Sequence, residues 1–259
     1  MGSRCEPGSQ QFGANRARQV DATAWKSAVT PTETRVPAPK AVEAGTFAAR
    51  SLGSGMAMNG KFSTTQSDPT TQYGTSCGRL LTAGRLCELV GGEPNAAAYS
   101  ELSNLNESLL FDGGLVCDSI MASCCHSALW LLHDYLDESH EISQSVDTPT
   151  GSYWHGIMHR REPDFSNAAY WFRRVGTHPV FAELVIAARD LARAAQADEH
   201  ADQAFLIRQA TWDPFRFIDL CSAAVEGRSN CDLLCRQVAE AEWRLLFDYC
   251  YREACSKHS

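Results

Sequence analysis

The chain has 259 residues, of which 21% are charged and 44% are apolar, and its formal net charge is −8. These values are typical of a globular protein with a sizeable core, and the negative charge argues against general affinity for nucleic acid or an anionic membrane. No apolar run approaches the roughly 18–20 residues that a membrane-spanning helix needs. The N-terminus also lacks the apolar core of a secretory signal.

The N-terminal part differs in composition from the rest. Residues 1–75 are rich in Gly, Ser, Thr, Ala and Pro, with few large aliphatic residues and no sustained periodicity. Such a segment buries too little apolar surface to offset its ordering entropy. We therefore predict a disordered, low-complexity extension over 1–75 and a single all-α domain over 76–259.

The domain reads as a series of helices. Apolar spacing predicts helices over 78–90, 96–105 and a long one over 116–143. Pro149–Gly151 is expected to break the chain before a short helix over 153–161. Cap and proline signals then predict four more helices, over 166–174, 180–195, 215–225 and 230–254. No alternating strand is evident, so we expect an all-α helical bundle of six to eight helices.

The eleven cysteines form no Cys-x-x-Cys pair. Several lie on apolar helix faces, where free cysteine behaves as a small buried hydrophobe. This usage favours a reduced compartment and a cytoplasmic protein.

One long segment carries a resemblance. GSYWHGIMHRREPDFSNAAYWFRRVGTHPVF at 151–181 resembles a family of uncharacterised bacterial proteins. The flanking segments LLHDYLDESHEISQ, WDPFRFIDLC and EWRLLFDYCYREA are similar to it too, so the likeness covers about 125–254. The resemblance implies one module and supplies no activity.

Histidines gather in the same region. His126, His133 and His140 recur every seven residues, which places them on nearly one face of a helix. His155 and His159 are four apart, which places their rings on adjacent turns of another helix. The apolar residues that flank His126 predict that it is a core residue.

The remaining histidines predict a metal site. If the two helices form an antiparallel hairpin, their imidazoles face each other, and bundle proteins often build metal sites in such places. Asp137 and Glu162 lie at helical spacing from these histidines. Each carboxylate is therefore a candidate metal ligand or a candidate catalytic residue that acts as general base. The predicted ligands of a divalent metal ion are His133, His140, His155 and His159.

Two known kinds of helical metal site share part of this pattern. Di-iron bundles use paired Glu-x-x-His motifs, which the chain does not repeat. His155-Gly-Ile-Met-His159 resembles the His-x-x-x-His pair of the DinB-type thiol-transferase and hydrolase-like bundles, which implies a third ligand from His140 or His133. In that family the pair lies near the chain end, whereas about 100 residues follow here.

Arginines supply a second constellation. Arg160, Arg161 and Arg173 lie near four aromatic residues, and arginine forks bind phosphate or carboxylate through two hydrogen bonds. An anionic small molecule beside the metal is one interpretation. The other is that these arginines pair internally with Glu162 and Asp164 and fix the loop.

Two functions follow from these patterns. The first is metal-dependent hydrolysis or group transfer on an anionic small molecule by a soluble helical protein, with no nucleic-acid or membrane partner. The second is a non-enzymatic helical scaffold or interaction protein, in which the same side chains form a structural buried polar network.

Overall fold

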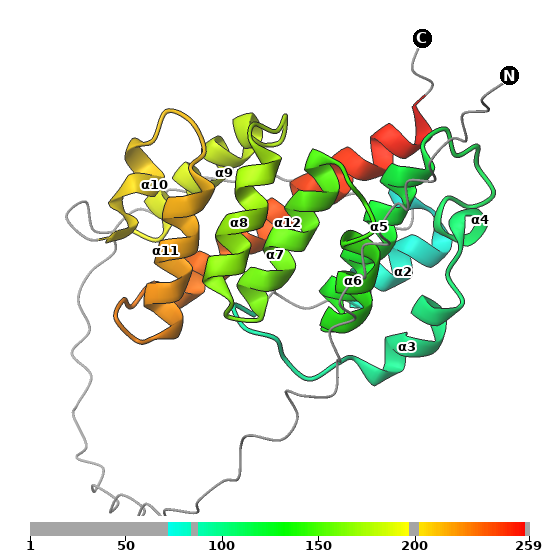
Figure 1. The fold of residues 1–259 in the computed structure, drawn as a ribbon, viewed down its shortest axis with the longest axis horizontal. Helices are drawn as coiled ribbons and strands as arrows, with labels where there is room; N and C mark the ends of the chain where they lie inside the picture. Colours follow the sequence, from blue (N-terminus) through cyan, green and yellow to red (C-terminus); the bar gives the residue numbers. More distant parts are fainter. Residues whose placement is uncertain (1–71, 84–87, 197–201, 257–259) are drawn as a thin grey trace, which may run out of the picture. The chain divides into compact units, whose positions relative to one another are not determined.

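The computed structural model describes residues 72–83, 88–196 and 202–256 (Figure 1), all of which belong to one compact unit over 61–259. These residues form eleven α-helices, one 3-10 helix and no strand. In chain order the elements are α2 (Thr75–Ala83), α3 (Ala96–Ser103), α4 (Glu107–Leu110), α5 (Ser119–Leu132), α6 (Leu136–Ser143), α7 (Pro149–Arg161), α8 (Phe165–Val175), α9 (Phe181–Ala194), η1 (Asp202–Ala204), α10 (Phe205–Arg208), α11 (Pro214–Val225) and α12 (Asp232–Cys255).

The all-α class is therefore confirmed. There are more helices than the six to eight expected, partly because α4 and α10 are single turns of four residues, too short to show periodicity. The extension predicted over 1–75 falls almost entirely outside the described residues, and the domain boundary at residue 76 stays a prediction. Among the described residues, no helix is long and apolar enough to cross a membrane.

The long helix predicted over 116–143 is wrong. The chain leaves α5 at His133, Asp134 adopts a left-handed φ of 65°, and α6 begins at Leu136. The two helices then pack against each other. A seven-residue repeat holds one face only while the helix is continuous, so His133 and His140 no longer share a face.

The central helix is α7, which packs beside α6 and α8 (Figure 1). The predicted break at Pro149–Gly151 is wrong, because Pro149 opens this helix instead. Thr148 caps it by accepting the Gly151 N–H at 3.0 Å, and proline suits the first turn because its missing N–H would be unpaired there. Twelve of the thirteen α7 residues are buried, so every face of the helix, polar side chains included, lies inside the protein.

The α12 helix supplies the other buried wall. It packs against α5, α9 and α11, and its Glu242 carboxylate is 0% exposed. That carboxylate forms an ion pair with Arg160 of α7 and accepts the Tyr153 hydroxyl at 2.9 Å. A polar network thus ties α7 to α12 within an otherwise apolar core.

The close approach of α7 and α8 depends on Gly156. A Cβ atom at this position would lie 2.8 Å from the ring of Phe172, which is itself 1% exposed. We therefore expect Gly156→Ala to lower the free energy of unfolding by about 1–3 kcal/mol, the usual cost of overpacking a core. Chemical denaturation measures this loss. Gly113→Ala has open space around it but a positive φ, so it serves as the control for backbone strain without crowding.

Candidate metal centre

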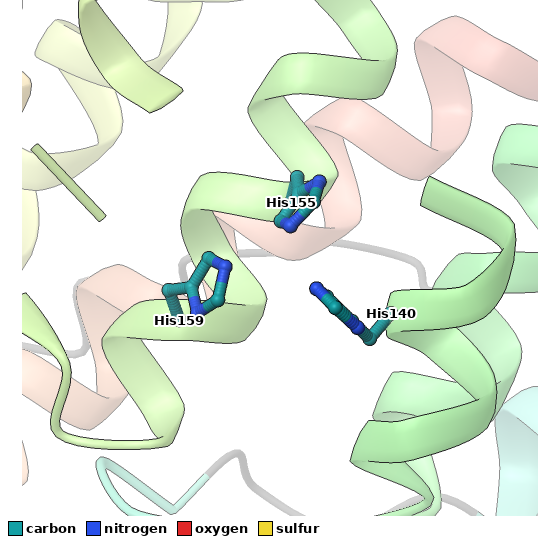
Figure 2. A group of neighbouring side chains, drawn as sticks. All are labelled: His140, His155 and His159. Atoms are coloured by element: carbon teal, nitrogen blue, oxygen red, sulfur yellow. The ribbon is translucent and has the colours of Figure 1, made fainter. Parts of the chain in front are cut away.

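Three of the predicted histidines come together between α6 and α7 (Figure 2). His140 projects from α6 toward His155 and His159, with ring centroids 4.6 Å and 5.3 Å away. One ring nitrogen from each residue lies within 4.8 Å of the other two. Bonds of ~2.0–2.1 Å to a tetrahedral ion hold such nitrogens about 3.3 Å apart. Side-chain rotations that close the gap by roughly 1–1.5 Å are enough to create that geometry.

The two α7 histidines are held by helix geometry and by α8. Spacing of four places their rings on adjacent turns, and these rings stack at 4.8 Å. Trp171 of α8 lies face to face with His155, with centroids 3.8 Å apart and planes within 16°. The indole thus restricts the tilt of the His155 ring.

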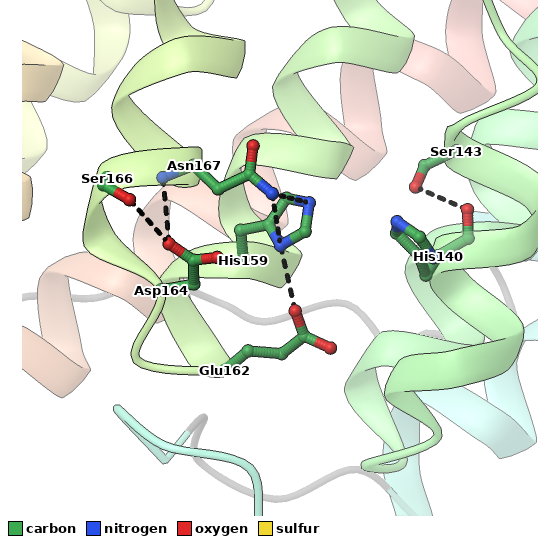
Figure 3. A network of polar contacts seen from close by, with 7 residues as sticks. All are labelled: His140, Ser143, His159, Glu162, Asp164, Ser166 and Asn167. Atoms are coloured by element: carbon green, nitrogen blue, oxygen red, sulfur yellow. Dashed lines mark hydrogen bonds and ion pairs between the residues drawn. The ribbon is translucent and has the colours of Figure 1, made fainter. Parts of the chain in front are cut away.

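A carboxylate orients the His159 ring, as Figure 3 shows. The Nδ1 atom of His159 lies 2.9 Å from the Glu162 carboxylate. A carboxylate only accepts, so Nδ1 carries the proton and Nε2 presents its lone pair. Histidines that bind metals commonly donate their second N–H to a carboxylate in this way.

Asn167 contacts the remaining nitrogen of His159. Its side-chain amide nitrogen lies 3.0 Å from Nε2 (Figure 3) and donates to that lone pair. The backbone N–H of Asn167 is used separately, to bond the Asp164 carboxylate that caps α8. A metal ion at Nε2 therefore has to displace one amide hydrogen bond, while the helix cap stays intact.

The charge state of the cluster suits a cation. Burial, followed by the neighbouring histidines, lowers the pKa of His155 to about 3, and burial lowers the pKa of His140. Both imidazoles are neutral at pH 7, which is the form that binds metals. The Nδ1 atom of His155 is buried and has no hydrogen-bond partner among the described residues. An unpaired buried nitrogen is costly, and coordination would remove that cost.

The two predicted carboxylates take different positions. Glu162 acts on His159 through its hydrogen bond and is 36% exposed. Asp137 is exposed on α6, one helical turn before His140, and its charge acts to raise the pKa of that histidine. Glu162 is thus an orienting group, and Asp137 is a charge at the edge of the cluster.

His133, the fourth predicted ligand, lies elsewhere. Its Nδ1 contacts the Asn95 amide at 3.0 Å, and its Nε2 contacts the Leu80 carbonyl at 3.1 Å. His133 is the C-cap residue of α5, so its ring connects the end of this helix to the preceding part of the chain. Among the described residues, the group that could hold a metal ion contains His140, His155 and His159 without it.

Two of the three predicted anion-binding arginines lie inside the protein and not at the edge of a ligand site. Arg160 is buried against Glu242, and Arg161 is buried against Asp134. Both guanidiniums therefore have carboxylate partners inside the fold. These partners are not the Glu162 and Asp164 carboxylates considered from sequence, since Glu162 bonds His159 and Asp164 caps α8. Arg173 is exposed on α8.

Three residues that shape the site were not among the predicted site residues: Asn167, Trp171 and Arg174. The Arg174 guanidinium lies 5.2 Å from the centre of the Trp171 ring, on the residue that stacks against His155. The available signal was the i, i+4 spacing of Asn167 and Trp171, which matches that of His155 and His159 on the neighbouring helix.

Comparison of the chain with protein-family models, curated proteins and solved structures finds no match. The two resemblances noted from the sequence therefore stay expectations.

Proposed function

We propose that His140, His155 and His159 bind a divalent transition-metal ion, with zinc as the first choice. The observation that carries this proposal is the convergence of three imidazoles, one of which is oriented by a carboxylate. Imidazole ligands suit zinc and neighbouring metals. Three protein ligands leave a fourth position for water or substrate, the arrangement found at catalytic zinc sites.

The proposed chemistry is metal-assisted hydrolysis or group transfer. A metal at this position lowers the pKa of a bound water and so generates a nucleophile near neutral pH. Asp137, exposed beside His140, is the proposed general base, because Glu162 is committed to His159. The proposed substrate is an anionic small molecule. The exposed Arg173 and Arg174 replace the buried Arg160 and Arg161 as its proposed binding groups. Arg174 pairs with Asp147 at 2.6 Å, but that pair is exposed to solvent, so a bound anion would compete with the Asp147 carboxylate.

The test is metal stoichiometry in protein without an affinity tag. The full chain is stripped with chelator, equilibrated with zinc or cobalt and analysed for bound metal. We expect about one ion per chain, and a tetrahedral absorption spectrum with cobalt. The double variant His155→Ala/His159→Ala is expected to lose the ion. His126→Ala is the matched control, since His126 contacts Leu102 and Trp130 outside the cluster. Equal metal contents in all three proteins would sink the proposal.

Glu162 gives a graded prediction. Glu162→Gln removes the anionic acceptor of the His159 Nδ1–H but keeps the shape of the side chain. Loss of such a partner weakens metal binding by about 10–100-fold. Competition titration with a chromophoric chelator measures this change. Glu141→Gln, an exposed substitution on α6, should leave the affinity unchanged, and an equal effect of both variants would assign the change to net charge.

The second candidate function is a helical scaffold with a structural polar network. One observation favours it, the Asn167 amide that already bonds the His159 Nε2. Asn167→Ala separates the two candidates. At a metal site this variant keeps or gains affinity, because the ion no longer competes with the amide. In a purely structural network it lowers stability, and zinc stabilises neither the variant nor the parent protein.

A cytoplasmic location is also part of this proposal. The nine cysteines of the described ranges are all free thiols, which suits a reducing compartment.

A further inference from the structure

A second cluster of reactive groups lies at the start of α12. The sulfur atoms of Cys231 and Cys235 are 3.4 Å apart. Cys231 is the N-cap residue of the helix, and its carbonyl accepts the Cys235 N–H at 2.8 Å. Cys221 of α11 also bonds the Cys235 thiol through its side chain. Three thiols therefore meet where α11 and α12 adjoin.

The first two thiols are spaced for a disulfide. Residues four apart at a helix start have Cα atoms about 6 Å apart, inside the range that a disulfide spans. Bond formation at ~2.05 Å needs the sulfurs to close by roughly 1.4 Å. A disulfide also needs Cβ atoms about 3.5–4.5 Å apart, closer than the roughly 5–6 Å of residues four apart within a helix. Cys231 is the N-cap residue, with a non-helical φ of −109° and ψ of 21°, so its backbone can adjust while the body of α12 stays in place.

The surroundings make the two thiols chemically unequal. The Ser229 hydroxyl donates to the Cys231 sulfur at 3.1 Å. The Cys235 thiol, followed by this hydroxyl, lowers the pKa of Cys231 to about 6, whereas its thiol neighbours raise the pKa of Cys235. Cys231 is thus the attacking thiolate and Cys235 the resolving thiol, since the thiolate is the reactive form.

Position in the chain separates this pair from the other cysteine pair, although all four thiols are buried. Cys231 is 5% exposed and Cys235 0% exposed, but Cys231 directly follows the loop 226–230, in which every residue is exposed or half-buried, so displacement of this short loop opens its sulfur to a small disulfide. Cys124 and Cys250 bond each other too, and they are 1% and 0% exposed inside the helices α5 and α12. Burial raises the pKa of Cys250, so that pair serves as an internal reference of low reactivity.

We propose that Cys231 and Cys235 form a redox-active dithiol that exchanges with low-molecular-weight disulfides of the glutathione type. The Cys231 thiolate attacks one sulfur of the small disulfide, forms a mixed disulfide and releases one small thiolate. Cys235 then loses its proton and attacks the Cys231 sulfur, which releases the second small thiolate. One intramolecular disulfide forms, two electrons pass to the small disulfide, and the two cysteine protons end on two small thiols.

The test uses the full-length protein in glutathione buffers of increasing oxidised fraction. Free thiols are alkylated after acid quenching, and peptide mapping locates the modified cysteines. We expect Cys231 and Cys235 to lose alkylation together as one two-electron couple. Cys235→Ser, or Cys235→Ala if the serine variant folds poorly, is expected to trap a glutathione adduct on Cys231. Cys250→Ser should leave the couple unchanged.

Two outcomes would overturn the inference. In the first, Cys231 and Cys235 stay alkylatable while the exposed Cys117 and Cys255 become modified, which assigns reactivity to exposure alone. In the second, zinc protects Cys221, Cys231 and Cys235 equally from alkylation in the His155→Ala/His159→Ala variant, which assigns the thiols to a separate metal site. The second result leaves the histidine proposal untouched.

Discussion

Arg160→Met is expected to lower the free energy of unfolding by about 3–5 kcal/mol, the usual cost of leaving one partner of a buried ion pair alone. Arg160 is 2% exposed and its partner Glu242 is 0% exposed. The guanidinium also lies 4.7 Å from the centre of the Phe217 ring. Methionine replaces most of the volume, so the loss reports mainly the uncompensated Glu242 charge. Urea denaturation at pH 7 measures it.

Two controls isolate the charge effect. Arg244→Met removes a pair with Glu240 on the surface of α12, where the side chains are 56% and 30% exposed, and it should cost less than about 1 kcal/mol. Arg160→Met/Glu242→Gln removes both buried charges and keeps an acceptor for Tyr153, so it should recover more than half of the loss. If Arg160→Met costs no more than Arg244→Met, the buried network does not stabilise the contact between α7 and α12.

His178 is expected to make the protein acid-sensitive between about pH 6.5 and pH 4. Its Nδ1 accepts the Val180 N–H at 3.3 Å, so a proton on that nitrogen would face another donor. Burial lowers the pKa of His178 from 6.5 to about 4. In this window the unfolded chain binds a proton that the folded chain does not. Stability therefore falls as the pH falls, by up to about 1.4 kcal/mol per pH unit, and this loss ends near pH 4.

Two measurements check this expectation. An NMR titration of the imidazole should place the His178 midpoint near pH 4. Denaturation of metal-free protein at several pH values should show a shallower acid limb in His178→Gln than in the parent chain. A midpoint at pH 6 or above would contradict the assignment, because the folded and unfolded states would then bind protons alike.

Helix boundaries were predictable where a side chain or proline gives a local signal. The helices predicted over 166–174 and 215–225 are found within one residue at each end, since Gly176 follows the end of α8 and Asp213 with Pro214 opens α11. The junction between α5 and α6 was missed, because apolar spacing continues across it and Asp134 adopts a left-handed φ with no glycine to mark it. Arg161 pairs with Asp134, a contact from a distant part of the chain. Such tertiary contacts leave no trace in local periodicity.

The site residues were likewise predictable where their relative position depends on one helix, and not where it depends on tertiary packing. His155 and His159 were placed correctly relative to each other because i, i+4 spacing depends on one helix alone. His140 required the packing of α6 on α7, and His133 was included only because the two helices were taken as one. Arg160 and Arg161 were predicted to bind an anionic ligand. Their carboxylate partners lie 82 and 27 residues away in the sequence, so no local pattern indicated them.

Because α6 is a separate helix, it also determines where the chain can accept an inserted residue without redirecting His140. His140 occupies the fifth position of an eight-residue helix, and each residue turns a helix by about 100°. One residue inserted between Leu136 and His140 would swing the imidazole away from α7, whereas one inserted in the exposed turn 112–114 would leave its direction unchanged. Natural variants of this chain that keep the three-histidine cluster should therefore vary in length at the turn and hold the count in α6 constant.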